Sequence, residues 1–180
     1  FNPSAVALGA NATFISRALD VDAKGLQESI KRAQRHKGAS FIEVYQNCII
    51  FNDGEFGDVE NKATRPDNAL FVVHGEPMIF GKEQDKGIIM EDHHPKVVQL
   101  GDKWSEKDLL VHDETNQIIT NLLLEMTFDT STPTPFGVLR AVDAPTYDEM
   151  MVEQIEQVTK IKGEGTFEDL FYSGDVWEVK

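Results

Sequence analysis

Residues 40–52, read SFIEVYQNCIIFN, constrain the fold most strongly because they concentrate β-branched, aromatic and aliphatic side chains. Within this segment, residues 41–45 form an apolar run of strand length. Such a run is typical of a strand that is covered on both faces in a parallel sheet. Gly38 lies just before it, after a helical pattern, and a turn at Asn52-Asp53 ends it. The segment therefore predicts a buried parallel strand.

The same segment carries Cys48, the only cysteine among 180 residues. A thiol at the carboxyl end of a buried parallel strand lies where α/β folds place their sites. Free cysteine is also among the most frequently buried residue types. From the residues alone we therefore favour a small buried core residue over a functional thiol.

The residues upstream of this segment predict a βαβ unit. A helix is expected to start at Pro3, a short strand to cover residues 13–16, and a second helix to cover residues 23–36. In the second helix, apolar side chains share one face and basic residues gather in the last turns. Strand, helix and strand in this order predict a parallel pair of strands joined by a helix.

The character of the chain changes after residue 52. Residues 53–69 are rich in Asp, Glu, Asn and Gly and lack apolar periodicity, so they predict a long surface loop. Residues 70–73 and 78–80 are expected to form two short strands around the turn sequence HGEP, as in a hairpin. Short strands are also expected over residues 87–90 and 97–100.

Three helices and one strand are expected in the remainder of the chain. The first helix starts at Asp113 or Thr115, and the strand spans residues 136–142. Thr146 and Glu149 have the spacing of a capping box and start a long helix. A shorter helix follows, and the chain ends in a strand or an extended tail.

Composition bounds the functional classes. Net charge is −14, with 31 acidic and 17 basic residues, which argues against general nucleic-acid binding. No apolar run approaches the roughly 20 residues of a membrane span, and we expect no membrane partner. One cysteine excludes an internal disulfide and suits a reducing, cytoplasmic location. The chain opens on Phe1 rather than methionine, so we expect a fragment or a processed product.

Motifs with independent chemical meaning are scarce. The sequence has no G-x-G-x-x-G, no Walker A and no H-E-x-x-H motif. His93-His94 could be read as a metal pair, but adjacent side chains point apart in a strand. His112-Asp113-Glu114 has the residue types of a general-base or metal cluster. Its place just before a helix favours capping of the helix N-terminus instead. The pattern alone supports a soluble α/β domain.

Longer stretches resemble a known family. HKGASFIEVYQNC, followed by IIFND, is similar to a stretch of the β subunit of 2-oxoacid:ferredoxin oxidoreductases. FNPSAVALGANATFISRAL resembles the helix and strand before it. HGEPMIFGKEQDKGI resembles a hairpin of the 2-oxoglutarate-type β subunits, and VDAPTYDEMMVEQI and SGDVWEV resemble their C-terminal tail. The resemblance covers nearly the whole chain.

The resemblance implies a fold and an activity. It implies that residues 1–52 are the C-terminal part of a thiamine-diphosphate-binding domain, a parallel βαβ fold. Residues 53–180 would then be the C-terminal region of the oxidoreductase β subunit, with a hairpin and helices. Together with an α subunit, such an enzyme oxidatively decarboxylates a 2-oxo acid, forms the acyl-CoA and passes electrons through an iron–sulfur cluster to ferredoxin. The implied cofactors are thiamine diphosphate, magnesium and a [4Fe–4S] cluster.

The resemblance also gives Cys48 a role. It aligns with a cysteine that completes the ligand set of the [4Fe–4S] cluster, in which four thiolates are usual. The other three ligands and the diphosphate motif belong to a region that precedes these residues in the family. We therefore assign no catalytic or thiamine-binding residue here, and expect the chain alone to be inactive and free of cofactor. One departure is Asn47, where family members often have proline.

A different class of function also fits the fold. The chain could be a non-catalytic binding or scaffolding module, which predicts a stand-alone reading frame and tolerance of Cys48→Ser. A thiamine-diphosphate motif and three cysteines encoded upstream of Phe1 would instead support the enzyme. If the chain is a truncated piece of the enzyme, we expect the apolar surface that its missing strands and the α subunit would cover to cause self-association.

Overall fold

The computed structural model describes residues 1–179, which form two compact units, Phe1–Ala144 and the residues from Pro145 onward. The helices are α1 (Pro3–Gly9), α2 (Ala23–Arg35), α3 (Gly57–Glu60), α4 (Arg65–Asn68), the 3₁₀ turn η1 (Glu106–Asp108), α5 (Gln117–Met126), α6 (Tyr147–Lys162) and α7 (Phe167–Phe171). The strands are β1 (Phe14–Leu19), β2 (Ser40–Tyr45), β3 (Ala69–Val72), β4 (Ile79–Phe80), β5 (Lys86–Glu91), β6 (His94–Gln99) and β7 (Thr134–Ala141).

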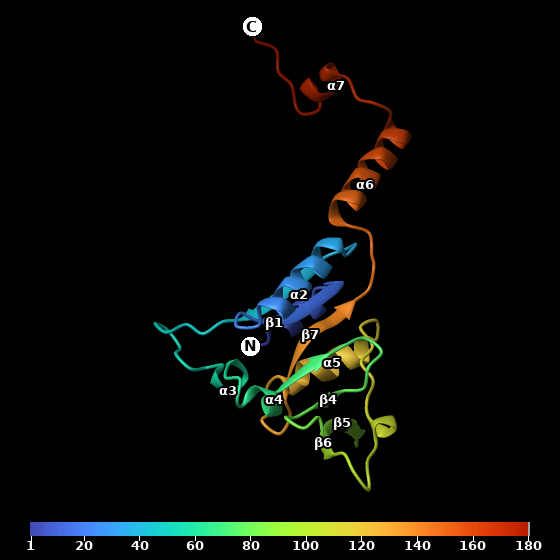
Figure 1. Ribbon diagram of the computed structural model, residues 1–180. Coiled ribbons are helices and arrows are strands. Elements are labelled where there is room, and N and C mark those ends of the chain that lie inside the picture. Colours follow the sequence, from blue (N-terminus) through green and yellow to red (C-terminus); the bar gives the residue numbers. More distant parts are fainter. Residues whose placement is uncertain (180) are drawn as a thin grey trace. The chain divides into compact units, whose positions relative to one another are not determined.

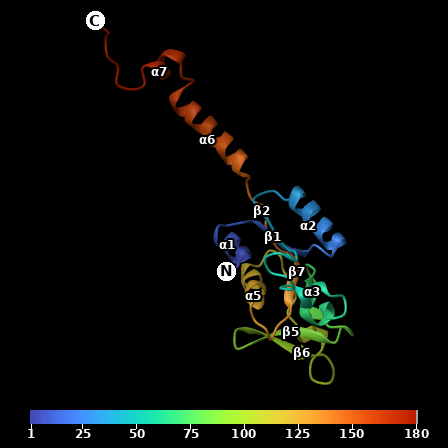
Figure 2. The same cartoon turned by 90° about the vertical axis from the view of Figure 1, so that its left-hand side faces the viewer.

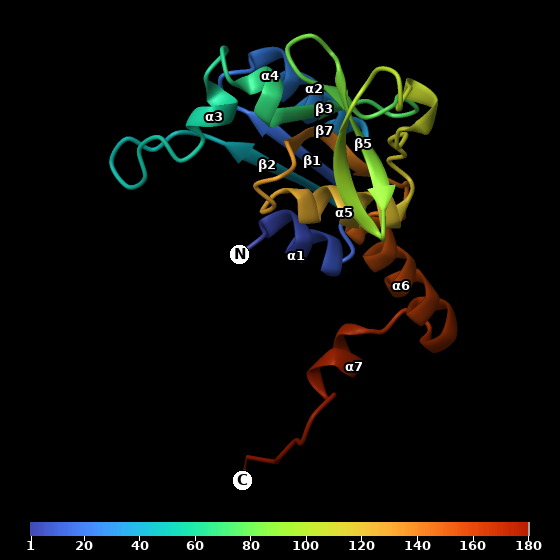
Figure 3. The ribbon, with the colours of Figure 1, turned by 90° about the horizontal axis from the view of Figure 1, so that it is seen from below.

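The first unit is built on a four-stranded sheet with the order β2-β1-β7-β3 (Figure 3). β1 and β2 are parallel and joined by α2, so the predicted βαβ unit is confirmed. β7 lies between β1 and β3, antiparallel to the former and parallel to the latter. The fold is therefore mixed α/β, as expected. The domain boundary expected after residue 52 stays a prediction. The sheet itself contains β1 and β2 from before this residue and β3 and β7 from after it.

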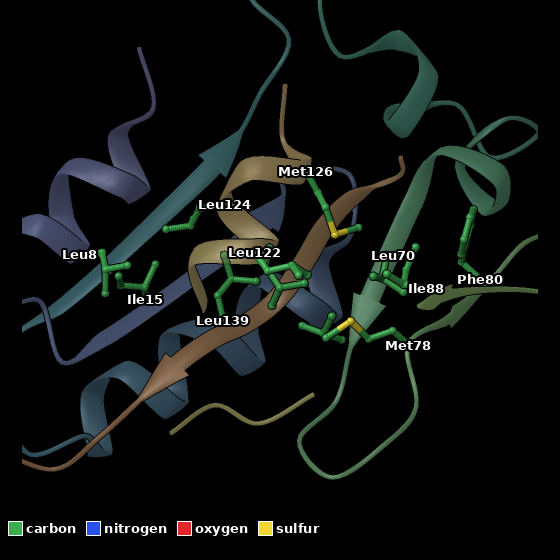
Figure 4. Close-up of a cluster of buried hydrophobic side chains, with 12 residues drawn as sticks. Leu8, Ile15, Leu70, Met78, Phe80, Ile88, Leu122, Leu124, Met126 and Leu139 are labelled. Carbon is green, nitrogen blue, oxygen red and sulfur yellow. The ribbon is translucent and has the colours of Figure 1, made fainter. Parts of the chain in front are cut away.

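Helices cover both faces of this sheet. Figure 2 shows α1 and α5 on one side and α2 on the other. The largest buried cluster lies under α1 and α5 and reaches the second sheet (Figure 4). Ile15, Leu123 and Leu139 are fully buried in it. Full burial of one such side chain stabilises the fold by roughly 1.5–3 kcal/mol.

The predicted complete burial of the segment around β2 is wrong. β2 is an edge strand, and its residues are half-buried or exposed. The apolar composition of β2 is the same as that of a central strand, which is why the sequence predicts burial. β2 differs from a central strand in its position, since among the described residues only β1 pairs with it.

The expectation of a structureless loop over residues 53–69 is also wrong. This stretch contains the short helices α3 and α4, and Val59 is buried in a small cluster with Leu19 and Phe136. Val59 is the buried residue of α3 and α4 has none, and a single buried position leaves no periodicity to detect.

The predicted hairpin of residues 70–73 and 78–80 does not form. β3 pairs with β7, whereas β4 pairs with β5 in a separate three-stranded sheet, β4-β5-β6. The hairpin of the second sheet is β5–β6, and its turn places Asp92 and His93 at φ 50° and 69°. Two successive positive φ angles give the twist that suits a two-residue hairpin turn. The strands expected over 87–90 and 97–100 belong to this hairpin.

The second unit is helical and confirms the predicted capping box of Thr146 and Glu149. Thr146 Oγ1 accepts a hydrogen bond from the backbone N–H of Glu149 at 3.3 Å and starts α6. Thr166 and Asp169 form a second capping box at the start of α7. Residues 176–179 are extended without strand pairing in the described part of the chain. Across residues 1–179, none of the helices combines the length and apolar character required to span a membrane.

Candidate functional site

The candidate site lies on the segment that connects β2 to α3, which extends away from the sheet (Figures 1 and 3). Aromatic packing closes its base. The Tyr45 ring, at the end of β2, stacks on Phe56 with a centroid separation of 4.2 Å. The guanidinium of Arg17 lies 5.3 Å from the centre of the Tyr45 ring. Both ends of the connecting segment are therefore fixed to the body of the sheet.

Hydrogen bonds from a single side chain order the segment above this base. The Asn47 amide nitrogen donates to Asp53 Oδ1 at 2.9 Å, and Asn47 Oδ1 accepts from the Gly54 backbone N–H at 2.9 Å. The Asn52 N–H donates to the Cys48 carbonyl at 2.9 Å. Asn47, noted as a departure from the family pattern, thus ties the two arms of the turn together.

Cys48 lies in this turn, three residues after β2, and is exposed. The interpretation as a buried core thiol is wrong, because β2 ends at Tyr45 and the chain then leaves the sheet. The backbone N–H groups of Phe51 and Ile50, in the same turn, are the main cause of a lowered pKa of the Cys48 thiol. A lowered pKa favours the thiolate, which is the form that binds metals.

The sulfur is flanked by apolar side chains without cover. Ile49, Ile50 and Phe51 are 76%, 80% and 89% exposed. A run of three large apolar residues at the tip of an exposed turn is expensive in water. It indicates a surface that another protein segment covers.

The described residues supply one soft ligand at this position and no more. Among residues 1–179, no group of three or more His, Cys, Asp and Glu side chains is placed to bind a metal ion. The chemistry of Cys48 fits one corner of a thiolate-ligated iron–sulfur cluster, which needs further ligands from outside these residues. His93 lies in the β5–β6 turn and His94 is the first residue of β6.

The chain offers no evident diphosphate site near the turn. A cavity of about 250 Å³ lies beside the base, lined by Tyr45, Phe56 and Thr127 and by the carboxylates Glu55 and Asp58. Its polar lining consists mainly of carboxylates and threonine hydroxyls, without a lysine or arginine. We assign no thiamine-diphosphate residue to it.

The triplet His112-Asp113-Glu114 does not cap α5, contrary to prediction. Asn116 caps that helix, and its side chain accepts from the N–H groups of Ile118 and Ile119. The triplet instead takes part in a polar network over the sheet. Arg32 donates two hydrogen bonds to Glu114, at 2.7 and 2.6 Å, and the His74 ring accepts from the Glu114 N–H. Sequence spacing gave no sign of this pair because α2 brings Arg32 there only in the folded chain.

His112 makes folding sensitive to acid. It is 1% exposed, its Nε2 donates to the Val138 carbonyl at 2.8 Å, and burial lowers the pKa of its ring. Below about pH 6.5 the His112 ring takes up a proton in the unfolded chain but not in the folded chain. The free energy of unfolding therefore decreases as the pH is lowered. We expect His112→Gln to reduce the loss of unfolding free energy between pH 7 and pH 5, measured by urea titration at both values. An equal loss in wild type and variant would contradict this role.

Comparison with known proteins adds to this geometry. No family model matches the chain. It is 33% identical to the 2-oxoglutarate oxidoreductase subunit KorB of Mycobacterium tuberculosis over 99% of its own length and 48% of that protein. It is 44% identical over 52 residues, 29% of the chain, to the 2-oxoacid:ferredoxin oxidoreductase subunit beta of Saccharolobus solfataricus, covering 17% of that protein.

A solved structure has the same fold. It is the 2-oxoglutarate:ferredoxin oxidoreductase of Magnetococcus marinus with 2-oxoglutarate, coenzyme A and succinyl-CoA bound. The TM-score is 0.56 at 18% identity, over 96% of this chain and 43% of that one. This likeness supports the mixed α/β architecture.

The resemblance found in the sequence is confirmed. The chain is a relative of the β subunits of 2-oxoacid:ferredoxin oxidoreductases. KorB aligns along nearly the whole chain, and the chain spans about half the length of KorB. It therefore corresponds to part of such a protein.

Proposed function

We propose that the chain is part of the β subunit of a 2-oxoglutarate:ferredoxin oxidoreductase. The observation that carries this proposal is the 33% identity to KorB along 99% of the chain. The whole enzyme would convert a 2-oxo acid and coenzyme A to an acyl-CoA and CO₂, and pass the two released electrons to ferredoxin. The names of the relatives favour 2-oxoglutarate as the 2-oxo acid.

Within that enzyme, we propose that Cys48 is one of four thiolate ligands of a [4Fe–4S] cluster. An exposed thiol with a lowered pKa, in a turn that Asn47 orders, suits this role. When bound, the cluster relays single electrons. The turn would orient the sulfur, and its backbone N–H groups would favour the thiolate.

The remaining parts of the site are proposed to lie outside these residues. Thiamine diphosphate, magnesium and three more cysteines would come from the rest of the β subunit and from its partner, the α subunit. Residues 1–52 would complete the thiamine-diphosphate-binding domain, and residues 53–180 would form the C-terminal region. The chain alone would be inactive and prone to self-association. A reducing cytoplasm fits a protein whose cysteines serve as thiolate ligands rather than in disulfides.

The test replaces Cys48 with serine in the assembled enzyme. We expect loss of the iron of that cluster and of the electron paramagnetic resonance signal of its reduced form, because serine supplies no soft thiolate. Ile49→Ser is the matched control, since it introduces the same residue at the neighbouring position, which is also exposed. It should keep the iron.

Two results would contradict the proposal at different levels. Unchanged iron and spectrum in Cys48→Ser would refute the ligand assignment alone. A purified wild-type complex without iron or 2-oxo acid oxidation would refute the assignment to this enzyme class.

A further inference from the structure

The turn that carries Cys48 consists of two arms and a tip. The incoming arm spans residues 45–48, the tip spans residues 49–51, and the outgoing arm spans residues 52–56. Where the arms meet the tip, the Asn52 N–H donates to the Cys48 carbonyl at 2.9 Å in an isolated antiparallel bridge. The sulfur therefore belongs to the last residue of the incoming arm that is tied to the outgoing arm.

A single side chain, that of Asn47, links the two arms between this bridge and the base of the turn. Its amide nitrogen donates to Asp53 Oδ1, and its Oδ1 accepts from the Gly54 N–H, both at 2.9 Å. The side chain is half-buried, although it belongs to an otherwise exposed turn. Together with the stacked rings of Tyr45 and Phe56 at the base, these two hydrogen bonds fix the separation of the arms.

A second asparagine of the turn makes a hydrogen bond of the same chemistry that does not cross it. The Asn52 amide nitrogen donates to Glu55 Oε2 at 3.0 Å, and both residues belong to the outgoing arm. The two hydrogen bonds of Asn47 span six and seven positions and connect one arm to the other. Of the two asparagines, only Asn47 therefore restricts the path of the backbone at Cys48.

Order in the turn has a direct consequence for ligation. A ligand on a mobile segment binds weakly, because the segment loses conformational entropy when the ligand atom is fixed. A metal centre also tolerates little displacement of its ligand atoms. Since the contacts of Asn47 order the turn in the absence of a cluster, the Cys48 sulfur has less entropy to lose on ligation.

We propose that Asn47 is a positioning residue, which holds the turn in the conformation in which the Cys48 sulfur is a ligand of the [4Fe–4S] cluster. This rests on the proposed function of Cys48. Asn47 acts through the turn, because both partners of its side chain belong to the outgoing arm. The role requires one donor and one acceptor on the same short side chain, which an amide supplies and a carboxylate does not.

Exchanging two side chains tests this role in the assembled enzyme. In Asn47→Asp, the new carboxylate still accepts from the Gly54 N–H, but it cannot donate to Asp53 and repels it. Adding Asp53→Asn returns a donor to the pair at the net charge of the wild type. We expect Asn47→Asp to speed the loss of cluster iron to a ferrous chelator by about fivefold or more, and the double variant to lie within about twofold of wild type.

Asn52→Ala is the matched control. It removes an amide–carboxylate hydrogen bond from the same turn without separating the arms, and it keeps the backbone bridge to Cys48. Iron loss should change by less than about twofold, because this hydrogen bond lies within one arm. An acceleration equal to that of Asn47→Asp would overturn the specific role of Asn47.

Two further measurements separate positioning from general stability. The turn lies outside the sheet, beyond the end of an edge strand, so Asn47→Asp should leave the urea midpoint of the β subunit unchanged while iron loss accelerates. In the cluster-free β subunit, Asn47→Ala should speed hydrogen exchange at the Gly54 amide by about fivefold or more, since that N–H loses its acceptor. Unchanged exchange, or a urea midpoint that falls in step with iron retention, would overturn the positioning role.

Cys48→Ser distinguishes failure of this role from failure of the proposed function. If Cys48→Ser keeps the iron, the ligand assignment fails, and the role of Asn47 fails with it. If Cys48→Ser loses the iron while Asn47→Asp releases it at the wild-type rate, only the positioning role is overturned. Rapid loss that Asp53→Asn does not correct would likewise overturn it, because the two side chains would then not act as a pair.

Discussion

Replacing Glu43 with alanine is expected to lower the free energy of unfolding of the chain by about 3–5 kcal/mol. Glu43 accepts a hydrogen bond from Arg17 Nε at 3.0 Å, and the Arg17 side chain is fully buried. Arg17 also donates to Thr127 Oγ1 and the Pro135 carbonyl. Without Glu43, the guanidinium keeps its charge in the interior without a counter-charge. Urea denaturation followed by circular dichroism measures the loss.

An exposed ion pair of the same chemistry serves as the control. Lys96 and Glu91 form a salt bridge in which both side chains are about half exposed. Glu91→Ala should change the unfolding free energy by less than about 1 kcal/mol, since water and salt screen such pairs. A double variant, Arg17→Met with Glu43→Leu, should recover much of the loss, because an apolar pair leaves no buried charge. Equal losses in Glu43→Ala and Glu91→Ala would contradict the prediction.

This ion pair also supports the candidate site mechanically. Arg17 lies against the Tyr45 ring, and Tyr45 stacks on Phe56 at the other end of the turn that carries Cys48. A buried charge at the base of an exposed ligand turn is a costly arrangement unless its partner is present. The stability of the sheet and the position of the sulfur therefore depend on the same contacts.

The features that could be predicted from the sequence are those set by neighbouring residues. The capping box of Thr146 and Glu149 and the periodicity of α2 depend on contacts within a few positions. The βαβ unit could also be predicted, because strand, helix and strand in close succession allow few topologies. Pairing of β3 with β7 could not be predicted, since the two strands are far apart in sequence and carry no complementary pattern.

For the site, the residues showed the thiol but not its surroundings. Composition placed Cys48 in a strand-like segment, and only the end of β2 at Tyr45 shows that it lies in an exposed turn. The resemblance supplied the ligand role, and the lowered pKa of the thiol became visible with the fold. The Arg32–Glu114 pair was missed because charged residues 82 positions apart have no local signature.

Gly137→Ala is expected to be nearly as damaging as the loss of Glu43. Gly137 lies in the middle of β7, opposite Arg17 of β1 and Val72 of β3, at φ +109°. A Cβ at this position would approach the Val72 carbonyl oxygen to 2.7 Å, and a backbone atom cannot move aside as a flexible side chain can. We expect a loss of about 2–5 kcal/mol in unfolding free energy, from backbone strain and displaced strands together.

Gly75→Ala separates these two causes. Gly75 also has a positive φ, +81°, but a Cβ there would meet nothing within 4 Å. It should therefore lose only about 1–2 kcal/mol, the cost of the left-handed conformation. The difference between the two variants, measured by urea denaturation, reports the close approach of β3 and β7. If the two losses are the same, the strand contact at Gly137 tolerates a methyl group, and the parallel pairing that places β3 beside β7 is looser than its register implies.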